Sequence, residues 1–300
     1  MTFSRRLRLL DESNACLAHA ALPLVMGVCN VTPDSFSDGG EAFGHEAAFA
    51  RVDQLLAEGA DVIDIGGEST RPGAPSVPAA EQLVRVLEVV RYAAARALVS
   101  IDTTDAEVAR ACLAAGARVV NDVSCLQDPA LATVTREADA CLVLMHARGP
   151  QSAMLGPGQP AQVQDDEDIV RAVLEEWRAA AARAEARGLA RERLVFDPGL
   201  GFGKTTEESM TLLCELRRLR AQLDVPMLVG ASRKSFLTTI DPAPPKDRLG
   251  ASVAAAVLAW QAGASCVRVH DVRATKQALA LTKHVHTTHT TVRERGAAHA

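Results

Sequence analysis

Aromatic residues are scarce in this chain of 300 residues, and two other features are missing. Phe, Trp and Tyr make up 3% of the sequence, so a core must rest on Ala, Val, Leu and Ile within the 48% of residues that are hydrophobic. The chain lacks any run of about 18 consecutive apolar residues, which argues against a membrane-spanning helix. A basic excess is missing as well. The formal net charge of −5 argues against nucleic acid or an anionic membrane as a partner, because both favour a basic face.

Closely spaced cysteine pairs and the pattern of a signal peptide are also missing from this sequence. The seven cysteines form no C-x-x-C motif, and several lie in apolar runs where a thiol acts as a small hydrophobe. We therefore expect reduced, buried cysteines in a cytoplasmic protein without disulfides. Residues 1–23 include basic residues but also Asp11 and Glu12, and no apolar core is followed by a small-residue cleavage site. The sequence thus predicts an N-terminal extension rather than a signal peptide.

Eight short apolar runs alternate with stretches of helix length. Their near-continuous apolar character indicates strands that are buried on both faces, as in a parallel sheet covered by helices. The runs span residues 24–30, 61–67, 98–104, 118–124, 141–147, 194–200, 226–232 and 266–272. Three of the intervening stretches end in glycine, which suits a helix C-cap (Gly59, Gly116 and Gly263).

This alternation, without a break in composition, predicts one α/β domain, a (β/α)8 TIM barrel over residues 24–285. Residues 286–300 have no apolar periodicity, and we expect a disordered tail there.

A polar residue ends each of the eight runs. In a barrel of parallel strands all the carboxyl ends open onto one face, so these side chains should share a pocket. Carboxylates, amides and cations together suit a polar, anionic small molecule. The polar endpoints are Asn30, Glu68 to Arg71, Asp102, Asn121, His146, Asp197, Ser232 to Lys234, and Arg268 with His270.

The glycine-rich segment DPGLGFGKT (197–205) superficially suggests a phosphate-binding loop. The G-x-x-x-x-G-K-[ST] pattern fails because Pro198 stands five residues before Gly203, and the spacing of the glycines also excludes G-x-G-x-x-G. Asp197 lies too far ahead of the next helix to cap it, since that helix is expected to begin near Thr205. A carboxylate that faces a ligand is therefore favoured.

The last two strands carry cationic groups. Arg268 and His270 alternate with apolar residues and so point to the same side of their strand. After the seventh strand, Ser232, Lys234 and Ser235 stand where we expect a helix to begin, which is a common anion site, although a simple serine cap explains them equally. Barrels often hold phosphate at these two strands, so the pair favours an anion.

The first loop offers oxygen atoms to a metal ion. Asn30, Asp34 and Asp38 are ligands of the kind that Mg²⁺ uses together with phosphate oxygens. Without a phosphate, the same spacing is ordinary turn chemistry.

Seven segments resemble the dihydropteroate synthase family of folate synthesis, in the family's order and over nearly the whole predicted barrel. They are residues 30–40, 64–74, 100–104, 119–124, 197–205, 230–236 and 267–272. The loop after His146, HARGPQSAM, departs from the family's usual methionine- and glutamine-rich version.

The resemblance implies a transferase that joins p-aminobenzoate to 6-hydroxymethyl-7,8-dihydropterin diphosphate, releases diphosphate and forms 7,8-dihydropteroate. It further implies Mg²⁺ as cofactor, small molecules as substrates, a homodimer, and inhibition by sulfonamides. The resemblance assigns the pterin ring to Asp102, Asn121, Met145, Asp197 and Lys234, and the diphosphate to Asn30, Arg268 and His270. It assigns p-aminobenzoate to Phe36, Thr70, Arg71, Pro72, Ser232 and Ser235, the metal to Asn30 and Asp38, and catalysis to Asp102, Lys234, Arg268 and His270.

An aryl amine is neutral at pH 7 and needs no strong base, so we expect an S_N1-like displacement in which loss of diphosphate is the hard step. Three alternatives stay open: a pterin-binding methyltransferase-type domain, a non-catalytic paralogue and a metal hydrolase on the same fold. The first would not need the two loops after the first and second strands, residues 31–44 and 68–78, which are rich in Gly, Pro, Ser and Asp. The last would need an H-x-H after the first strand, which is absent. None of these motifs gives His146 a role.

Overall fold

The structure, a computed structural model, describes residues 3, 21–32, 41–69, 76–149 and 168–297. Its centre is one sheet of eight strands with the order β6-β5-β4-β3-β2-β1-β8-β7, and neighbouring strands pair in parallel. A bridge between Phe196 and Met227 joins the two edge strands and closes the ring. The strands are β1 (Leu24–Asn30), β2 (Val62–Gly66), β3 (Leu98–Asp102), β4 (Val119–Asp122), β5 (Cys141–Met145), β6 (Leu194–Asp197), β7 (Leu228–Val229) and β8 (Cys266–Val269).

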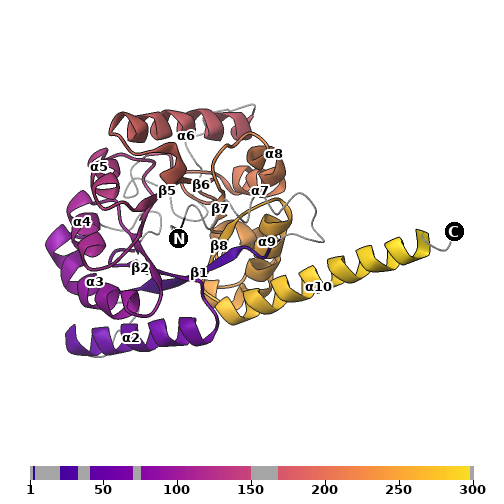
Figure 1. Ribbon diagram of the computed structural model, residues 1–300, viewed down its shortest axis with the longest axis horizontal. Coiled ribbons are helices and arrows are strands. Elements are labelled where there is room, and N and C mark those ends of the chain that lie inside the picture. The colour runs from indigo at the N-terminus through magenta and orange to yellow at the C-terminus, as the bar shows by residue number, and fades with distance from the viewer. Residues whose placement is uncertain (1–2, 4–20, 33–40, 70–75, 150–167, 298–300) are drawn as a thin grey trace.

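Helices surround the strands, as Figure 1 shows. Each connection between consecutive strands contains at least one helix or 3-10 turn, which is the (β/α)8 arrangement that the sequence predicts. The α-helices are α2 (Glu41–Ala57), α3 (Ala79–Ala94), α4 (Ala106–Ala114), α5 (Ala130–Glu137), α6 (Ile169–Ala186), α7 (Thr206–Cys214), α8 (Leu216–Arg220), α9 (Leu249–Gln261) and α10 (Val272–Ala297). The 3-10 segments are η4 (Arg191–Arg193), η5 (Ser235–Thr239) and η6 (Pro245–Asp247).

The side chains inside the barrel change from apolar to polar along its axis. Every second residue of a strand faces the interior, because side chains alternate between the two faces. Near the amino ends of the strands these positions form a small apolar cluster: Phe3, Leu24, Met26, Val62, Val119, Cys141, Val143, Val195, Leu228 and Cys266. Nearer the carboxyl ends, buried polar side chains follow: Asp64, Asp102, Asn121 and Asp197. The interior of the barrel is therefore apolar toward the amino ends of the strands and polar toward their carboxyl ends.

Local features of the sequence explain where the helices end. Gly59, Gly116 and Gly263 have positive φ values of 93°, 119° and 98°, which confirms the expected C-caps. Asp105 caps α4 by accepting from the backbone N–H groups of Glu107 and Val108.

The structure differs from expectation at three places. The turn after β7 is the five-residue η5 rather than an α-helix, so the argument from a helix dipole does not apply there. Helix α10 continues to Ala297 and so covers most of the stretch expected to be a tail, which contains no proline before that point. Cys214 is exposed, whereas the other described cysteines are buried as expected. Among the described residues, no helix combines the length and apolar character needed to cross a bilayer.

Candidate functional site

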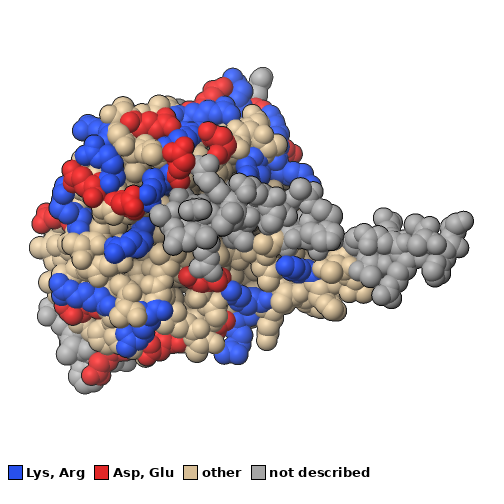
Figure 2. Space-filling view, viewed as in Figure 1, with Lys and Arg blue, Asp and Glu red and all other residues tan. Residues whose placement is uncertain are grey.

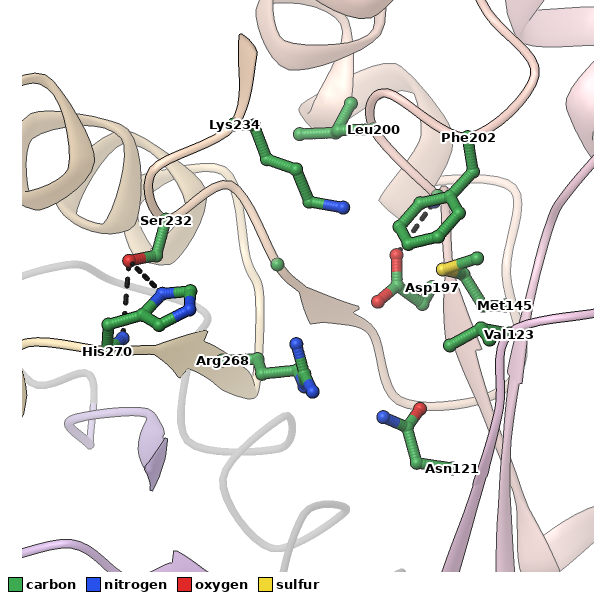
Figure 3. A pocket seen from close by; sticks show the side chains of 12 residues that line it. Asn121, Val123, Met145, Asp197, Leu200, Phe202, Ser232, Lys234, Arg268 and His270 are labelled. Carbon is green, nitrogen blue, oxygen red and sulfur yellow. Dashed lines mark hydrogen bonds between the residues drawn. The ribbon is translucent and has the colours of Figure 1, made fainter. Parts of the chain in front are cut away.

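A pocket opens at the carboxyl ends of the strands and collects side chains from five of them. Figure 3 shows Asn121, Asp197, Lys234 and Arg268 pointing toward one another across it, with Met145 and Phe202 on one wall. The structure therefore brings together most of the residues that the sequence singled out. The lining consists of Asn121, Val123, Met145, Asp197, Gly199, Leu200, Phe202, Gly230, Ser232, Lys234, Arg268 and His270.

Asp197 ends β6 and presents a buried carboxylate to this pocket. Its Oδ1 atom accepts a hydrogen bond of 2.7 Å from the backbone N–H of Gly199. Burial raises the pKa of Asp197 to about 6, an effect that this hydrogen bond and the charge of Lys234 oppose. Its other oxygen faces the cavity in Figure 3, where it can accept from a ligand.

Lys234 reaches the same cavity from the segment after β7. Its ammonium lies 3.6 Å from the centre of the Phe202 ring, a cation–π contact. Burial, together with the charge of Arg268, lowers the pKa of Lys234 to about 7. The preceding residue, Arg233, has a positive φ of 61°, and the hydroxyl of Ser252 holds it by accepting from its N–H at 2.9 Å. This turn sets the direction of Lys234.

Arg268 is the centre of a charge network across the barrel. Its Nε donates to Asp64 Oδ2 at 2.6 Å and its Nη2 to Asp102 Oδ2 at 2.7 Å. Asn121 donates from Nδ2 to the same Asp64 oxygen at 3.2 Å. Burial raises the pKa of Asp102 to about 7, although Arg268 opposes the shift. Asp102 thus lies beneath Arg268 rather than in the lining itself.

Two carboxylate atoms of this network have no hydrogen-bond partner in the described structure, namely Asp64 Oδ1 and Asp102 Oδ1. Buried oxygens without partners are costly, so they indicate that the network accepts donors from a ligand or from water.

The sequence reasoning missed Asp64 because the residue lies inside a strand and not at its end. The signal was available: Asp64 is the only charged residue in VIDIG, on a strand that is buried throughout. A lone carboxylate in such a strand requires a cationic or donor partner.

His270 follows β8 and is held by Ser232. The Ser232 hydroxyl accepts from the backbone N–H of His270 at 3.2 Å and lies 3.0 Å from Nδ1 of the His270 ring. Arg51 of α2 donates to the His270 carbonyl at 2.7 Å. Burial and the charge of Arg268 lower the pKa of His270 to about 3, so the ring is neutral in this state. The negative charge of an incoming anion would oppose the effect of Arg268 and favour the charged ring.

Two further predicted residues, Asn30 and Ser235, are not part of the pocket lining. Asn30 is exposed at the end of β1, and Ser235 opens η5. The predicted contacts Phe36, Asp38, Thr70, Arg71 and Pro72 lie outside the described residues. Within the described ranges, no group of three or more His, Cys, Asp or Glu side chains could hold a metal ion. His146 lies at the end of β5 but is not part of the lining, and its ring contacts Glu176 of α6.

Comparison with known proteins bears directly on this pocket. The chain matches the model of the pterin binding enzyme family over residues 26–270. It is 40% identical to the dihydropteroate synthase of Escherichia coli over 261 residues, which covers 86% of this chain and 89% of that protein. It is 45% identical over 249 residues to a probable bifunctional folylpolyglutamate synthase/dihydropteroate synthase of Halobacterium salinarum. That match covers 83% of this chain but only 30% of the relative, so the chain spans less than a third of it.

Solved structures give the same result. A dihydropteroate synthase of Xanthomonas albilineans with 4-aminobenzoic acid superposes with a TM-score of 0.79 at 44% sequence identity. The superposition covers 88% of this chain and 93% of that one. At this identity the likeness extends beyond the barrel fold, which many unrelated proteins share.

Proposed function

The chain belongs to the dihydropteroate synthase family of pterin-binding enzymes, and we propose that it condenses p-aminobenzoate with 6-hydroxymethyl-7,8-dihydropterin diphosphate. The products are 7,8-dihydropteroate and diphosphate. The observation that carries the proposal is the grouping of Asp197, Asn121 and Lys234 around one cavity, with Arg268 and His270 beside them. Such a cavity offers acceptors to a nitrogen-rich ring and cations to an anionic group on the same molecule.

The ring would lie between polar edges and an apolar wall. The Asp197 oxygen that faces the cavity can accept an N–H bond from an aminopyrimidine edge, while Asn121 and Lys234 meet the remaining ring heteroatoms. Met145 and Phe202 supply apolar contact. Ring N–H groups that donate to Asp102 would compete with Arg268 for that carboxylate and free the guanidinium for the diphosphate.

The chemistry that we propose is an S_N1-like displacement. The bond between the pterin methylene and the diphosphate oxygen breaks, and its electron pair goes to the leaving oxygen. The amine nitrogen of p-aminobenzoate then bonds to the methylene and gives up one proton to the released diphosphate or to water. Arg268 and His270 take up the charge of the leaving group, and Asp102 places negative charge near the cation that develops on the pterin.

We also propose that Mg²⁺ assists the departure of diphosphate. The donor chemistry fits, because Asn30 exposes an amide side chain at the carboxyl end of β1 and Mg²⁺ completes its shell with phosphate oxygens and water. The ion would supply positive charge to the leaving group. Asn30→Ala should raise the Mg²⁺ concentration for half-maximal activity about tenfold without changing the KM for p-aminobenzoate. A titration of activity against Mg²⁺ after chelation measures both, and an unchanged Mg²⁺ requirement would contradict the assignment of Asn30.

The function is tested by mixing the purified protein with the pterin diphosphate, Mg²⁺ and p-aminobenzoate. We expect one diphosphate released for each dihydropteroate formed, and competition between a sulfonamide and p-aminobenzoate. Release of diphosphate without consumption of the amine would indicate a hydrolase. Binding of the pterin without any release would indicate a non-catalytic pterin-binding protein.

The assembly that we propose is a homodimer, which exposed apolar side chains on the outer helices support. Leu258 on α9 is 53% exposed, and Leu281 and Val285 on α10 are 65% and 56% exposed. Figure 2, by contrast, shows acidic and basic side chains interspersed over much of the described surface in that view. The cytoplasmic location expected from the cysteines stays a prediction.

Leu258→Glu should convert the dimer to a monomer, because it places a charge in an apolar contact. Light scattering after gel filtration at micromolar concentration measures the mass of each form. Val84→Glu is the matched control, since Val84 is 51% exposed on α3, and this variant should remain dimeric. A monomeric wild-type protein would show the dimer proposal to be wrong.

A further inference from the structure

His146 and Lys204, two residues outside the pocket lining, meet where the end of β5 contacts the loop after β6. The loop carries three glycines with left-handed backbone, Gly199, Gly201 and Gly203. A Cβ atom at Gly199 would lie 1.8 Å from the His146 carbonyl oxygen, and one at Gly203 would lie 2.4 Å from the Arg148 carbonyl oxygen. The loop backbone is therefore docked against the chain after β5 as closely as two backbones can approach.

Lys204 ties these two segments together with one ammonium group. Its Nζ donates to the carbonyl oxygens of Gly199 at 2.9 Å, Phe202 at 3.1 Å and His146 at 3.3 Å. Three carbonyl oxygens match the three donors of an ammonium group. Burial lowers the pKa of Lys204 to about 7, so this charge is held at a cost that the three hydrogen bonds offset.

His146 holds the other side of the junction. Its ring is fully buried, and Nε2 lies 2.9 Å from the Glu176 carboxylate of α6. Burial lowers the pKa of His146 to about 4, and the bonds from His146 and Arg148 lower the pKa of Glu176 to about 2. A neutral ring beside an ionised carboxylate carries its proton on Nε2 and donates it. Arg148 donates to the other oxygen of Glu176 at 2.7 Å, so one carboxylate anchors two residues of the segment after β5.

The loop of residues 199–203 is linked to two side chains that line the pocket, Asp197 and Phe202. It begins two residues after Asp197, the last residue of β6, whose carboxylate accepts from the Gly199 N–H. Its tip carries Phe202, whose ring lies under the ammonium of Lys234. Any shift of the loop would move both the carboxylate and the aromatic wall.

We infer that Lys204 and His146 are positioning residues for the pterin site: they lock the loop of residues 199–203 against the end of β5, so that Asp197 and Phe202 stay in place. The inference rests on the proposed function for the identity of the ligand. It gives His146 a role, and it explains why Lys204 directly follows this loop although the segment fits no phosphate-binding pattern.

The test is Lys204→Met, which keeps the length of the side chain and removes its donors. We expect the Kd for the pterin diphosphate to rise ten- to hundredfold, because a displacement of about 1 Å in a binding wall has effects of this size. The KM for p-aminobenzoate should change less than threefold. Lys204→Arg, which keeps a cation and its donors, should recover most of the affinity. A merely structural lysine would reduce the active fraction and leave both constants unchanged.

Amide hydrogen exchange of the ligand-free protein gives a second readout that needs no activity. In Lys204→Met the peptide that covers residues 198–206 should exchange at least tenfold faster. Lys276→Met is the matched control: it removes another half-buried ammonium, which pairs with Asp61 at 2.7 Å at the opposite end of the barrel, and it should alter neither the exchange of this peptide nor pterin affinity. Unaltered exchange and affinity in Lys204→Met would overturn the inference.

Glu176→Ala serves if Lys204→Met does not fold, since the Glu176 side chain is 42% exposed. It should change the same two readouts in the same direction by three- to tenfold, and an unchanged peptide would again overturn the inference. If the wild-type protein does not bind the pterin diphosphate, the proposed function fails, while the exchange data still decide whether the loop is held in this way.

Discussion

Asp197→Asn should lower kcat/KM for the pterin diphosphate by about a thousandfold or more. When a buried site forms hydrogen bonds with its substrate, a change that leaves those polar groups unpaired lowers kcat/KM by factors of this order. The buried carboxylate uses one oxygen for the Gly199 N–H and turns the other toward the cavity. An asparagine would keep the first bond but would present an N–H group to the donors of the ring. Charge-assisted hydrogen bonds would be lost, and donors would face donors.

The thermal stability of Asp197→Asn should not fall together with its activity. Asp197 has a pKa of about 6 in the folded protein, above the value of about 3.9 for an unfolded chain, so its ionisation opposes folding as pH rises through that interval. Removing the charge therefore should leave the melting temperature at pH 8 equal to or above that of the wild type. The KM for p-aminobenzoate should change less than twofold.

Asp224→Asn is the control for the substitution itself. Asp224 pairs with Arg191 on the surface, and its side chain is 66% exposed. Its replacement should leave kcat/KM unchanged. Steady-state kinetics and calorimetric pterin binding on both variants decide the matter, and an Asp197→Asn protein with wild-type pterin affinity would refute the role of this carboxylate.

The strand ends were predictable from sequence because two physical regularities fix them. A parallel strand covered by helices is apolar over most of its length, and the chain turns polar where it leaves the sheet. Asp102 and Asp197 therefore end their strands, and Asn121 lies one residue before the end of β4. The closed ring then places those ends together. Residues that are far apart in sequence therefore lie close together at the carboxyl ends of the strands.

Contacts between side chains that are distant in sequence, and contacts to backbone carbonyl groups, were not predictable. Asp64 meets Arg268 across the barrel at a sequence separation of 204 residues, and no local pattern specifies that pair. Lys204 bonds to carbonyl oxygens, which every residue possesses, so its partners leave no mark in the sequence. The 3-10 conformation of η5 was not predictable either. In a segment of only five residues, the i+3 hydrogen bonds of a 3-10 helix and the i+4 bonds of an α-helix require similar sequences. Motifs therefore located the pocket, whereas the network that holds it came from the structure.

Arg268→Met should lower the free energy of unfolding by about 3 to 5 kcal/mol at pH 8, the loss typical when one partner of a buried ion pair is removed. Asp64 and Asp102 are 0% and 2% exposed, and Arg268 donates to both. Without the guanidinium, two carboxylates face each other inside the barrel. As a control for the loss of an arginine, Arg91→Met removes a surface pair with Glu88 in which both side chains are 55% exposed, and it should leave the stability unchanged.

The pH dependence separates charge from packing in Arg268→Met. Asp102 already has a folded-state pKa of about 7, raised by burial above its unfolded value of about 3.9, so its contribution to stability declines as pH rises from about 4 to 7. Loss of Arg268 removes the main group that lowers this pKa, so in the variant the decline continues above pH 7. The stability deficit should therefore be largest at pH 8 and fall to less than half at pH 5, where a protonated Asp102 leaves less uncompensated charge. Urea unfolding at both pH values measures the deficit. An equal deficit at pH 5 and pH 8 would mean that Arg268 acts through the packing of its aliphatic stem, and the buried charge network would then not be the reason for its place in the barrel.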